Sequence, residues 1–322
     1  MTGEAGGIPP AGTSPRGFLT LADVPVAAWP ALWDRAAHLE RNRLASTLAG
    51  RTIALVMEKA STRTRVSFEV AAYELGGNSV VLSSAGSQLA RGESAEDTAR
   101  VLSSYCHAII VRTFGQDRVA AFARAASVPV INALSDQHHP CQVATDLHTV
   151  RQHFGHQRFG ALRYAWIGDG NNMAQSWLEA AGMFGLELVV ACPDGFAPDG
   201  QLVAAARAEQ QRFGRGSITL TTEPLEAAAG AHVLSTDVWA SMGQEDDAAR
   251  RAAAFAGYQM DSALIARAAS DAIVLHCLPA HRGEEITGDV LDGPRSLAWV
   301  QAANRLPVAK ALLEQVLAPG TA

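Results

Sequence analysis

Lysine is almost missing from this chain of 322 residues, which carries only Lys59 and Lys310. Nearly all of its 26 basic side chains are therefore arginine, whose planar guanidinium binds phosphate and carboxylate through paired hydrogen bonds. The formal charge of −6 and the isoelectric point near 5.9 exclude a general nucleic-acid binder, because such a protein needs a basic surface. We therefore expect any anionic ligand to be held by a local group of arginines.

Cysteines and long apolar runs are also scarce. The four cysteines are far apart and form no CxxC pair, which predicts free thiols in a reducing, cytoplasmic setting. No apolar run reaches the length of a membrane span, so no membrane partner is expected. Residues 1–16 are rich in Gly, Pro, Thr and Ala without the apolar core of a targeting peptide, and are predicted to form a flexible tail.

Short apolar runs alternate with longer helical patterns along most of the chain. This alternation predicts an α/β protein, and the length predicts two domains, each a parallel β-sheet flanked by helices. The predicted strands are residues 53–57, 79–82, 108–111 and 128–132 in the first half, and 163–167, 188–191, 218–221, 232–234 and 272–275 in the second. The predicted helices are residues 63–75, 94–105, 117–126, 141–154, 173–184, 198–213 and 307–317, of which 141–154 connects the halves.

The most informative stretch is Ser61-Thr62-Arg63-Thr64-Arg65, which lies between a predicted strand and a predicted helix. The N-terminus of a helix offers free N–H groups and a positive dipole, and the serine, threonine and arginine side chains add donors for phosphate oxygens. The stretch therefore predicts a site for a phosphorylated small molecule. The alternative is that Ser61 only caps the helix and the arginines face solvent.

Polar side chains also follow several other predicted strands, as Arg112, His139, Asn172, Asp237 and His276-Cys277 show. Ligands of parallel sheets bind beyond the carboxyl ends of the strands, so endings of this kind in both halves predict one cleft between two domains. Asn172 at a helix start either binds a polar substrate group or caps the helix, and Asp237 either binds an ammonium group or acts as a cap.

The histidines favour catalysis over metal binding. His139 and Gln142 are one helical turn apart, which lets both face one ligand carbonyl, whereas the spacings typical of metal ligands are missing. We expect no metal ion, and we expect His148, His153 and His156 to lie on the surface.

Two further motifs admit a functional and a plain interpretation. Gly168-Asp169-Gly170-Asn171-Asn172-Met173 joins a strand to a helix but lacks the third glycine of a dinucleotide loop, so we expect no nicotinamide cofactor. Cys277 is either a nucleophile or, as for most free cysteines, a small buried hydrophobic residue.

Four segments together resemble the aspartate and ornithine carbamoyltransferase superfamily, over about residues 18–317. They are Ser61-Thr62-Arg63-Thr64-Arg65, His139-Pro140-Cys141-Gln142, Asp237-Val238-Trp239-Ala240-Ser241-Met242-Gly243 and His276-Cys277-Leu278-Pro279. The resemblance implies a transferase that moves the carbamoyl group of carbamoyl phosphate to the side-chain amine of L-ornithine, giving L-citrulline and phosphate for arginine biosynthesis. It further implies that no metal or cofactor is used and that the protein is a homotrimer or a multiple of trimers.

The resemblance also implies a set of site residues. Those for carbamoyl phosphate are Ser61, Thr62, Arg63, Thr64, Gln88, Arg112, His139, Gln142, the main chain at Leu278, and Arg305. Those for ornithine are Asn172, Asp237, Ser241, Met242 and Cys277, and those implied to be catalytic are Arg112, His139 and Cys277. Residues 17–152 are expected to bind carbamoyl phosphate, residues 153–300 to bind ornithine, and residues 301–322 to form a helix that returns to the N-terminal domain.

Two other functions stay open at this point: carbamoyl transfer to a different amine, and binding of a phosphorylated ligand without catalysis. The segment from Asp237 to Gly243 favours ornithine, because Asp237 matches its α-ammonium group, which putrescine would not present in the same way. Three residues depart from the family pattern: Ala303 stands where relatives usually have Glu, and Ala133 and Ala90 stand where Gly is common. Loss of the Glu is expected to loosen Arg305.

Overall fold

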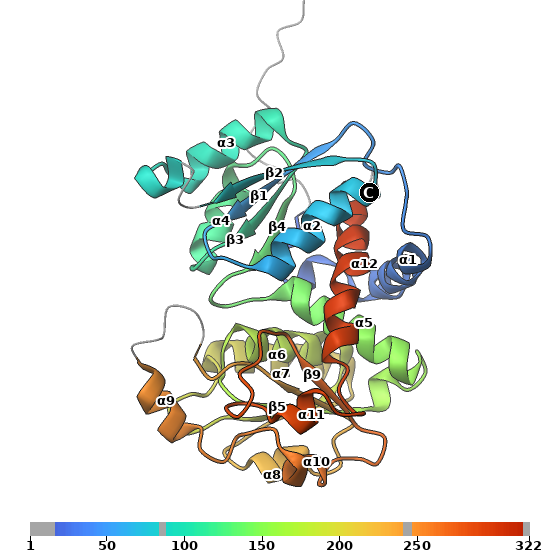
Figure 1. The fold of residues 1–322 in the computed structure, drawn as a ribbon, viewed down its shortest axis with the longest axis vertical. Coiled ribbons are helices and arrows are strands. Elements are labelled where there is room, and N and C mark those ends of the chain that lie inside the picture. The colour runs from blue at the N-terminus through green and yellow to red at the C-terminus, as the bar shows by residue number, and fades with distance from the viewer. Residues whose placement is uncertain (1–16, 84–87, 241–246, 318–322) are drawn as a thin grey trace, which may run out of the picture.

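The computed structural model describes residues 17–83, 88–240 and 247–317, which form two halves, one above the other in Figure 1. The tail predicted at residues 1–16 lies outside the described residues. The N-terminal half contains a parallel sheet with strand order β2-β1-β3-β4. Its strands are β1 (Thr52–Met57), β2 (Asn78–Ser83), β3 (Ala108–Arg112) and β4 (Val130–Leu134).

The C-terminal half contains a second parallel sheet, with strand order β7-β6-β5-β8-β9. Its strands are β5 (Arg163–Ile167), β6 (Glu187–Ala191), β7 (Ser217–Thr221), β8 (Val233–Thr236) and β9 (Ile273–His276). The nine predicted strands are all present, with ends that differ from the prediction by two residues at most. The predicted fold class is therefore confirmed.

Helices cover both faces of each sheet. The α-helices are α1 (Trp29–Arg41), α2 (Thr62–Glu74), α3 (Ala95–Tyr105), α4 (Gln116–Ala125), α5 (Pro140–Phe154), α6 (Asn172–Phe184), α7 (Gly200–Phe213), α8 (Pro224–Ala228), α9 (Ala248–Ala254), α10 (Ser262–Ile265), α11 (Gly288–Leu291) and α12 (Ala298–Leu317). Short 3-10 helices lie at Leu21–Asp23, Val26–Ala28, Gln88–Arg91 and Phe159–Ala161. None of the helices in the described ranges combines the length and apolarity needed to cross a membrane.

Strand β1 shows why the strand predictions succeeded. Ile53, Leu55 and Met57 pack into a cluster with α2, α5 and α12, while Ala54 and Val56 pack into another with α3 and α4. Since successive side chains of a strand point to opposite faces, a strand buried on both faces must be apolar throughout. Continuous apolar runs are therefore the signature of the central strands in both halves.

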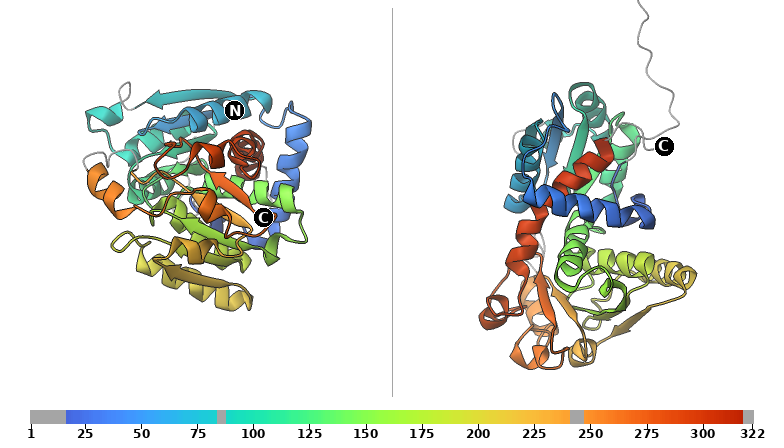
Figure 2. Two further views of the ribbon diagram at one scale, coloured as in Figure 1. Left: turned by 60° about the horizontal axis from the view of Figure 1, so that its bottom comes forward. Right: turned by 90° about the vertical axis from the view of Figure 1, so that its right-hand side faces the viewer.

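The last helix differs from the prediction, which began it at Pro307. It begins at Ala298, and Pro307 lies inside it. A proline usually marks the start of a helix because it lacks the N–H that interior positions need. Here α12 is buried against α1, α2 and α5, and this packing outweighs the lost hydrogen bond. Arg305 therefore lies within a buried helix that runs from the C-terminal half back into the N-terminal half (Figure 2).

Helix α1 was missing from the prediction, although its signal is visible in the sequence. Trp29, Leu32, Trp33, Ala36 and Leu39 recur at helical spacing and are all buried. Nothing in the structure explains why helix α1 was not predicted.

Aromatic side chains join the two halves behind the cleft. The rings of Trp29 and Phe184 lie 5.8 Å apart between centroids, and those of Trp33 and Phe159 lie 5.4 Å apart. The first ring of each pair comes from α1 and the second from the C-terminal half, and all four belong to one apolar cluster that continues through both halves. Large buried rings carry much of the packing energy of an interface. The junction is therefore a hydrophobic core and not only a covalent link.

His148 contradicts the prediction that it lies on the surface. It is on α5, with only 2% of its surface exposed, and neither ring nitrogen has a hydrogen-bond partner in the described part of the chain. Burial, together with the charge of Arg151, lowers its pKa to about 4. The apolar packing of α5 between the halves explains this position, whereas His153 and His156 are exposed as predicted.

Replacing His148 by leucine is expected to make the protein less sensitive to acid. The unfolded chain protonates this histidine near pH 6.5 and the folded protein only near about 4. Stability is therefore lost as the pH falls between these values, by up to about 1.4 kcal/mol per pH unit for one group. Urea unfolding at several pH values should show that the free energy of unfolding changes less steeply with pH in His148→Leu, so the slope of free energy against pH is flatter. His153→Leu, on the exposed side of the same helix, should keep the slope of the unchanged protein; equal slopes for all three proteins would contradict the prediction.

Candidate active site

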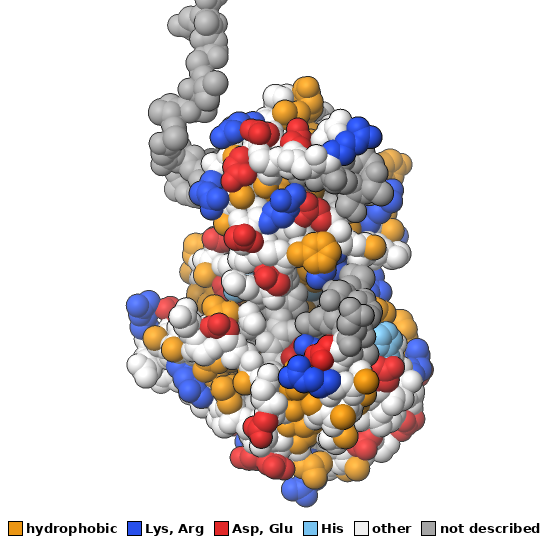
Figure 3. Space-filling model, turned by 90° about the vertical axis from the view of Figure 1, so that its left-hand side faces the viewer, with side chains coloured by type: hydrophobic (Ala, Val, Ile, Leu, Met, Phe, Trp, Pro, Cys, Tyr) orange, Lys and Arg blue, Asp and Glu red, His pale blue; other side chains and the backbone are white. Residues whose placement is uncertain are grey.

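The predicted site residues gather at the point in each sheet where the strand order reverses. In the N-terminal half this is between β1 and β3, and in the C-terminal half between β5 and β8. Ser61 follows β1, Arg112 ends β3, Asn171 and Asn172 follow β5, and Asp237 follows β8. Such reversals leave a crevice beyond the carboxyl ends of the strands. The space-filling view shows a recess between the two halves (Figure 3).

The serine and threonine side chains lie at the N-terminus of α2. Ser61 is the N-cap residue, and its hydroxyl accepts a hydrogen bond from the Thr64 amide at 3.3 Å. Thr64 is buried, while Arg65 is exposed and pairs with Glu69. Capping and ligand binding are compatible here, because the other free N–H groups of the first turn stay available to an anion.

The charged groups of three arginines lie in the same region, and none of them pairs with a carboxylate of the described residues. Arg63, Arg112 and Arg305 form no salt bridge within the described ranges, and Arg112 Nε is buried without any hydrogen-bond partner. Burial, and then the charges of Arg305 and Arg63, lower the pKa of Arg112 to about 10. The guanidinium still carries its charge at neutral pH. A group of like charges that is held together in this way is suited to bind an anion with more than one negative charge.

His139 precedes α5 and is almost completely buried. Burial, together with Arg305, Arg112 and Arg63, lowers its pKa well below 6.5, so the imidazole is neutral at physiological pH. Its amide donates to the Ser176 hydroxyl at 2.9 Å, which fixes the backbone, and its buried Nδ1 has no hydrogen-bond partner among the described residues. A neutral imidazole between arginines can donate a hydrogen bond to a carbonyl oxygen without adding positive charge.

Gln142 connects the arginines to a buried carboxylate. Its Oε1 accepts from Arg305 Nη1 at 2.6 Å, and its Nε2 donates to Asp146 Oδ1 at 2.8 Å. Arg305 also donates to the Thr64 hydroxyl at 3.4 Å. Helices α2, α5 and α12 are therefore linked at the site by side-chain hydrogen bonds.

Asp237 and Cys277 face each other in the C-terminal half. The Cys277 thiol donates to Asp237 Oδ1 at 3.0 Å, and Asn171 Nδ2 donates to Asp237 Oδ2 at 3.1 Å. Burial and the adjacent carboxylate raise the pKa of Cys277 well above its usual value. Because only the thiolate is a strong nucleophile, this environment disfavours covalent catalysis by Cys277.

Leu278 brings its main chain to the cleft from the C-terminal half. Its φ of 57° lies in the left-handed region, which is unfavourable for a leucine, and the Leu278-Pro279 peptide is cis. The Leu278 carbonyl accepts from Arg63 Nη2 at 2.5 Å, and its amide donates to His276 Nδ1 at 2.9 Å. His276 is held in turn by Glu285 at 3.0 Å. The segment after β9 is thus held against the N-terminal half through Arg63.

The N-cap of α6 is Asn171 and not Asn172, for which the sequence left a capping role open. Asn171 is the N-cap of α6, accepting from the Met173 and Ala174 amides. Asn172 is not the cap; its Nδ2 donates to the Ser135 carbonyl of the N-terminal half at 2.6 Å. The capping alternative for Asn172 is therefore wrong.

Gly170 of the loop before α6 allows a close backbone contact. A side chain at Gly170 would meet the backbone nitrogen of Pro198 at 2.3 Å. Asp169 faces Arg251 of α9 at 2.8 Å, and Arg251 also donates to the Trp239 carbonyl at 2.7 Å. Close backbone contact explains the glycine, and the Asp169–Arg251 pair holds the segment that follows Asp237.

Two groups of side chains have ligand atoms within 4.8 Å of one another, a spacing that a metal ion needs. The first consists of Asp237, His276 and Cys277, and the second of His281, Glu284 and Glu285. Both ring nitrogens of His276 are used by Leu278 and Glu285, and the Cys277 thiol is used by Asp237. These internal hydrogen bonds already engage the ligand atoms of the first group.

Some predicted site residues stand apart. Gln88 is exposed, and within the described ranges its side chain contacts only Arg91, at 3.4 Å. Ser241 and Met242 lie outside the described residues.

Conversely, sequence reasoning missed Asp146 and Gln301. Asp146 follows Gln142 by one helical turn, which was a usable signal, whereas nothing in the sequence pointed to Gln301.

The departures from the family pattern leave the described contacts intact. Ala303 is exposed on α12, and Arg305 is instead held by Gln142 and Thr64. Ala133 is fully buried in β4.

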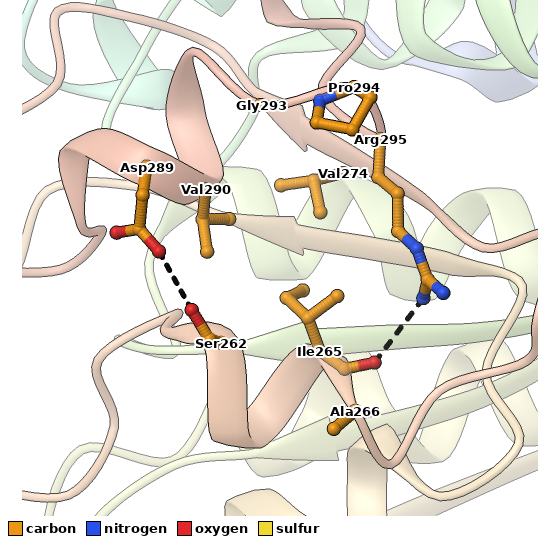
Figure 4. Close-up of a pocket in the computed structure, with 9 residues that line it drawn as sticks. All are labelled: Ser262, Ile265, Ala266, Val274, Asp289, Val290, Gly293, Pro294 and Arg295. Carbon is orange, nitrogen blue, oxygen red and sulfur yellow. Dashed lines mark hydrogen bonds between the residues drawn. The ribbon is translucent and has the colours of Figure 1, made fainter.

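A separate cavity of about 330 Å³ lies in the C-terminal half, between α10, α11 and β9 (Figure 4). Its walls are mostly apolar, with Ile265, Val274 and Val290 among them. Its polar groups are paired internally: Ser262 donates to Asp289 at 2.7 Å, and Arg295 donates to the Ile265 carbonyl at 3.4 Å. The cavity shares no residue with the groups around Arg112 and Asp237.

Comparison with known proteins identifies one family for both halves of the chain. Family models described as "Aspartate/ornithine carbamoyltransferase, carbamoyl-P binding domain" and "Aspartate/ornithine carbamoyltransferase, Asp/Orn binding domain" match residues 16–152 and 161–316. The ornithine carbamoyltransferase of Acidothermus cellulolyticus is 54% identical over 304 residues, which cover 94% of this chain and 96% of the relative.

Solved structures similar to this protein belong to the same family. The ornithine carbamoyltransferase from Pyrococcus furiosus matches with a TM-score of 0.89 at 40% identity, covering 96% of this chain and 99% of the other. The anabolic ornithine carbamoyltransferase from Campylobacter jejuni also has a TM-score of 0.89, at 37% identity, covering 94% and 98%. Since these matches extend along nearly the whole chain in both sequence and fold, the chain belongs to the aspartate/ornithine carbamoyltransferase family.

Proposed function

We propose that this protein transfers the carbamoyl group of carbamoyl phosphate to the side-chain amine of L-ornithine, giving L-citrulline and phosphate. The observation that carries the proposal is the group formed by Arg63, Arg112 and Arg305, which has no salt-bridge partner within the described ranges. A phosphate dianion would supply the missing negative charge. The names of the relatives, at up to 54% identity, support the same donor and acceptor.

We assign the donor to the N-terminal half. The phosphate would be held by the start of α2 and its side chains, by Arg112 and Arg305, and by Gln88 at its edge; the full set is Ser61, Thr62, Arg63, Thr64, Gln88, Arg112 and Arg305. The carbamoyl group would be held by His139, Gln142 and the main chain at Leu278. The neutral His139 and the charged Arg112 can both donate to the carbonyl oxygen.

We assign the acceptor to the C-terminal half. Asp237 would bind the α-ammonium group of ornithine, with Asn172, Ser241 and Met242 as further contacts. Cys277, held as a thiol beside Asp237, would lie next to the reacting amine. Residues 17–152 and 153–300 are accordingly proposed as the donor and acceptor domains, with residues 301–322 returning to the first.

The chemistry needs position and charge more than a covalent intermediate. The amine nitrogen forms a bond to the carbamoyl carbon, the bond from that carbon to the phosphate oxygen breaks, and the nitrogen loses a proton. Negative charge grows first on the carbonyl oxygen and then on the departing phosphate. Arg112, His139 and the N-terminus of α2 are placed to stabilise both charges as they form.

The test is citrulline formation from carbamoyl phosphate, with ornithine, putrescine and aspartate compared as acceptors. We expect kcat/KM with ornithine to exceed that with putrescine by at least about 10²-fold, because putrescine has no α-carboxylate to fix its second ammonium group against Asp237. Turnover with another amine but not with ornithine would support a carbamoyltransferase for a different acceptor. Binding of carbamoyl phosphate without turnover of any acceptor would support a non-catalytic phospholigand binder.

We further propose a homotrimer or a multiple of trimers. Large apolar side chains are exposed on the N-terminal half, including Tyr73 on α2 and Tyr105 on α3, which are 75% and 73% exposed. Strand β2 is an edge strand with Val80 exposed. Most of the large apolar side chains that are exposed in the described ranges lie on this half, and exposed apolar surface is typical of contact between subunits. Light scattering should give a multiple of three 33.9 kDa chains, and a monomer would contradict the proposal.

We also propose that the protein acts in the cytoplasm, in arginine biosynthesis. Its four cysteines are all free thiols, which fits a reducing compartment.

A further inference from the structure

We propose that Asp146 is a positioning residue for carbamoyl transfer, because one of its carboxylate oxygens orients the amides of Gln142 and Gln301 and so turns the Gln142 oxygen towards the donor substrate. The inference rests on the proposed function. Asp146 itself touches no substrate in this scheme.

The geometry is a branched chain of hydrogen bonds around one oxygen atom. Asp146 is 1% exposed, and its Oδ1 accepts from Gln142 Nε2 at 2.8 Å and from Gln301 Nε2 at 2.5 Å. The oxygens of the two amides point away from Asp146: that of Gln142 accepts from Arg305, and that of Gln301 accepts from the His276 amide at 2.9 Å. Asp146 therefore stands between the residues proposed for the donor and the segment that carries Cys277 and Leu278.

An amide side chain can be turned over by 180°, which exchanges its donor and its acceptor. An ionised carboxylate only accepts hydrogen bonds, so it holds the NH₂ group of Gln142 and leaves the oxygen free. In the opposite orientation the NH₂ group would face Arg305, and two donors would meet. The oxygen is also the atom that can accept from the NH₂ group of a carbamoyl ligand. Asp146 thereby selects the productive orientation.

Charged or titratable groups from three elements face Asp146: Arg305 on α12, Asp237 after β8 and the Cys277 thiol after β9. Burial raises the pKa of Asp146 to about 7, against the hydrogen bonds from Gln142 and Gln301 and the charge of Arg305. Above this pH the carboxylate is an acceptor only. Below it the acid can donate, and the overturned Gln142 amide becomes possible. The orienting effect is therefore present at alkaline pH and is lost as the pH falls through about 7.

The decisive variant is Asp146→Asn, which keeps the shape and adds an N–H donor in place of the charge. We expect kcat/KM for carbamoyl phosphate to fall about tenfold near pH 8, the effect of one misplaced hydrogen bond. Near pH 6, where the wild-type carboxyl is largely protonated, the ratio of wild type to variant should approach one. Comparing the two proteins cancels the titration of the substrates. A ratio that does not change with pH would overturn the proposal.

Thr149→Val is the matched control. Thr149 lies on the same helix and accepts from Asn304 of α12 at 2.9 Å, so the variant loses a buried hydrogen bond between α5 and α12 but leaves Gln142 alone. It should lose stability without a pH-dependent change in kcat/KM. If Thr149→Val gave the same pH-dependent ratio as Asp146→Asn, the role of Asp146 would be structural only.

Two further measurements keep the inference testable. Binding of inorganic phosphate, measured by calorimetry, needs no turnover; wild-type binding without citrulline formation would reject the proposed function while still allowing the variants to be compared. If Asp146→Asn does not fold, Gln301→Met removes one of the two amides and leaves the carboxylate charged. It should lower kcat/KM about threefold to tenfold near pH 8 and move the pH dependence to higher pH, because a hydrogen bond that opposes the rise in the pKa of Asp146 is lost. An unchanged kcat/KM would contradict the network.

Discussion

Replacing Arg112 by methionine is expected to lower kcat for citrulline formation about 10³-fold, the loss seen when a preorganised donor to a developing oxyanion is removed. Arg112 ends β3 and is buried beside Arg63 and Arg305, and no described residue accepts a hydrogen bond from its side chain. Its donors are therefore free for the ligand. Because the negative charge on the carbonyl oxygen and phosphate grows during the reaction, the loss should be larger in kcat than in the affinity for carbamoyl phosphate.

Arg65→Met is the control for this experiment. Arg65 belongs to the same motif, but it is exposed and pairs with Glu69, so kcat should stay within about twofold of wild type. Steady-state kinetics with both substrates varied would separate kcat from KM. A kcat of Arg112→Met within about tenfold of wild type, with weak binding of carbamoyl phosphate, would limit Arg112 to binding.

Replacing Lys310 by methionine is expected to destabilise the protein by about 3–5 kcal/mol, the cost of removing one partner from a buried ion pair. Lys310 is on α12 and is 1% exposed. Its ammonium group donates to the Leu39 and Arg43 carbonyls at 2.9 and 3.0 Å and to Glu74 at 2.8 Å. It thus satisfies the end of α1 and a carboxylate of α2 at once. The variant would leave these acceptors short of a donor inside the core.

Arg35→Met gives a comparison on the same pair of helices. Arg35 of α1 pairs with Glu314 of α12 at 2.6 Å, but its side chain is 37% exposed, so the loss should be about 1 kcal/mol or less. Urea unfolding monitored by fluorescence would measure both changes. A cost below about 1 kcal/mol for Lys310→Met would show that the buried pair contributes no more than a surface pair.

The sheets were predictable, and an anion site could be proposed, because their signals are local. A strand buried on both faces must be apolar, as β1 is, and a helix N-terminus that binds an anion needs residues such as Ser61 to Thr64 in sequence. Arg112 and Asp237 could be proposed as site residues for the same reason, since each follows an apolar run. His148 was misplaced because an isolated polar residue in a helix does not reveal which neighbours will cover it.

The rest of the site depends on contacts between residues that are far apart in the chain. Gln301 reaches Asp146 over 155 positions, and Arg305 reaches Thr64 over 241. Both arginine and glutamine come from α12, whose start was hidden by Pro307, a residue that ordinarily opens helices. The burial of α12 among three other helices outweighs the preference of proline for the start of a helix. The sequence could supply the residues of the site but not the hydrogen bonds that orient them.

Helix α12 also has a consequence for how the molecule responds to cleavage. The chain crosses between the halves at the connection from α5 to β5 and again when α12 returns to the N-terminal half. A protease that cuts once within residues 155–158, which are exposed, would yield a C-terminal fragment that still carries α12, with its apolar face buried among α1, α2 and α5. The two fragments should therefore stay bound in a nicked protein and separate only under denaturing conditions. The halves of this enzyme are joined by two segments of the chain, and α12 would still join them after the first has been cut.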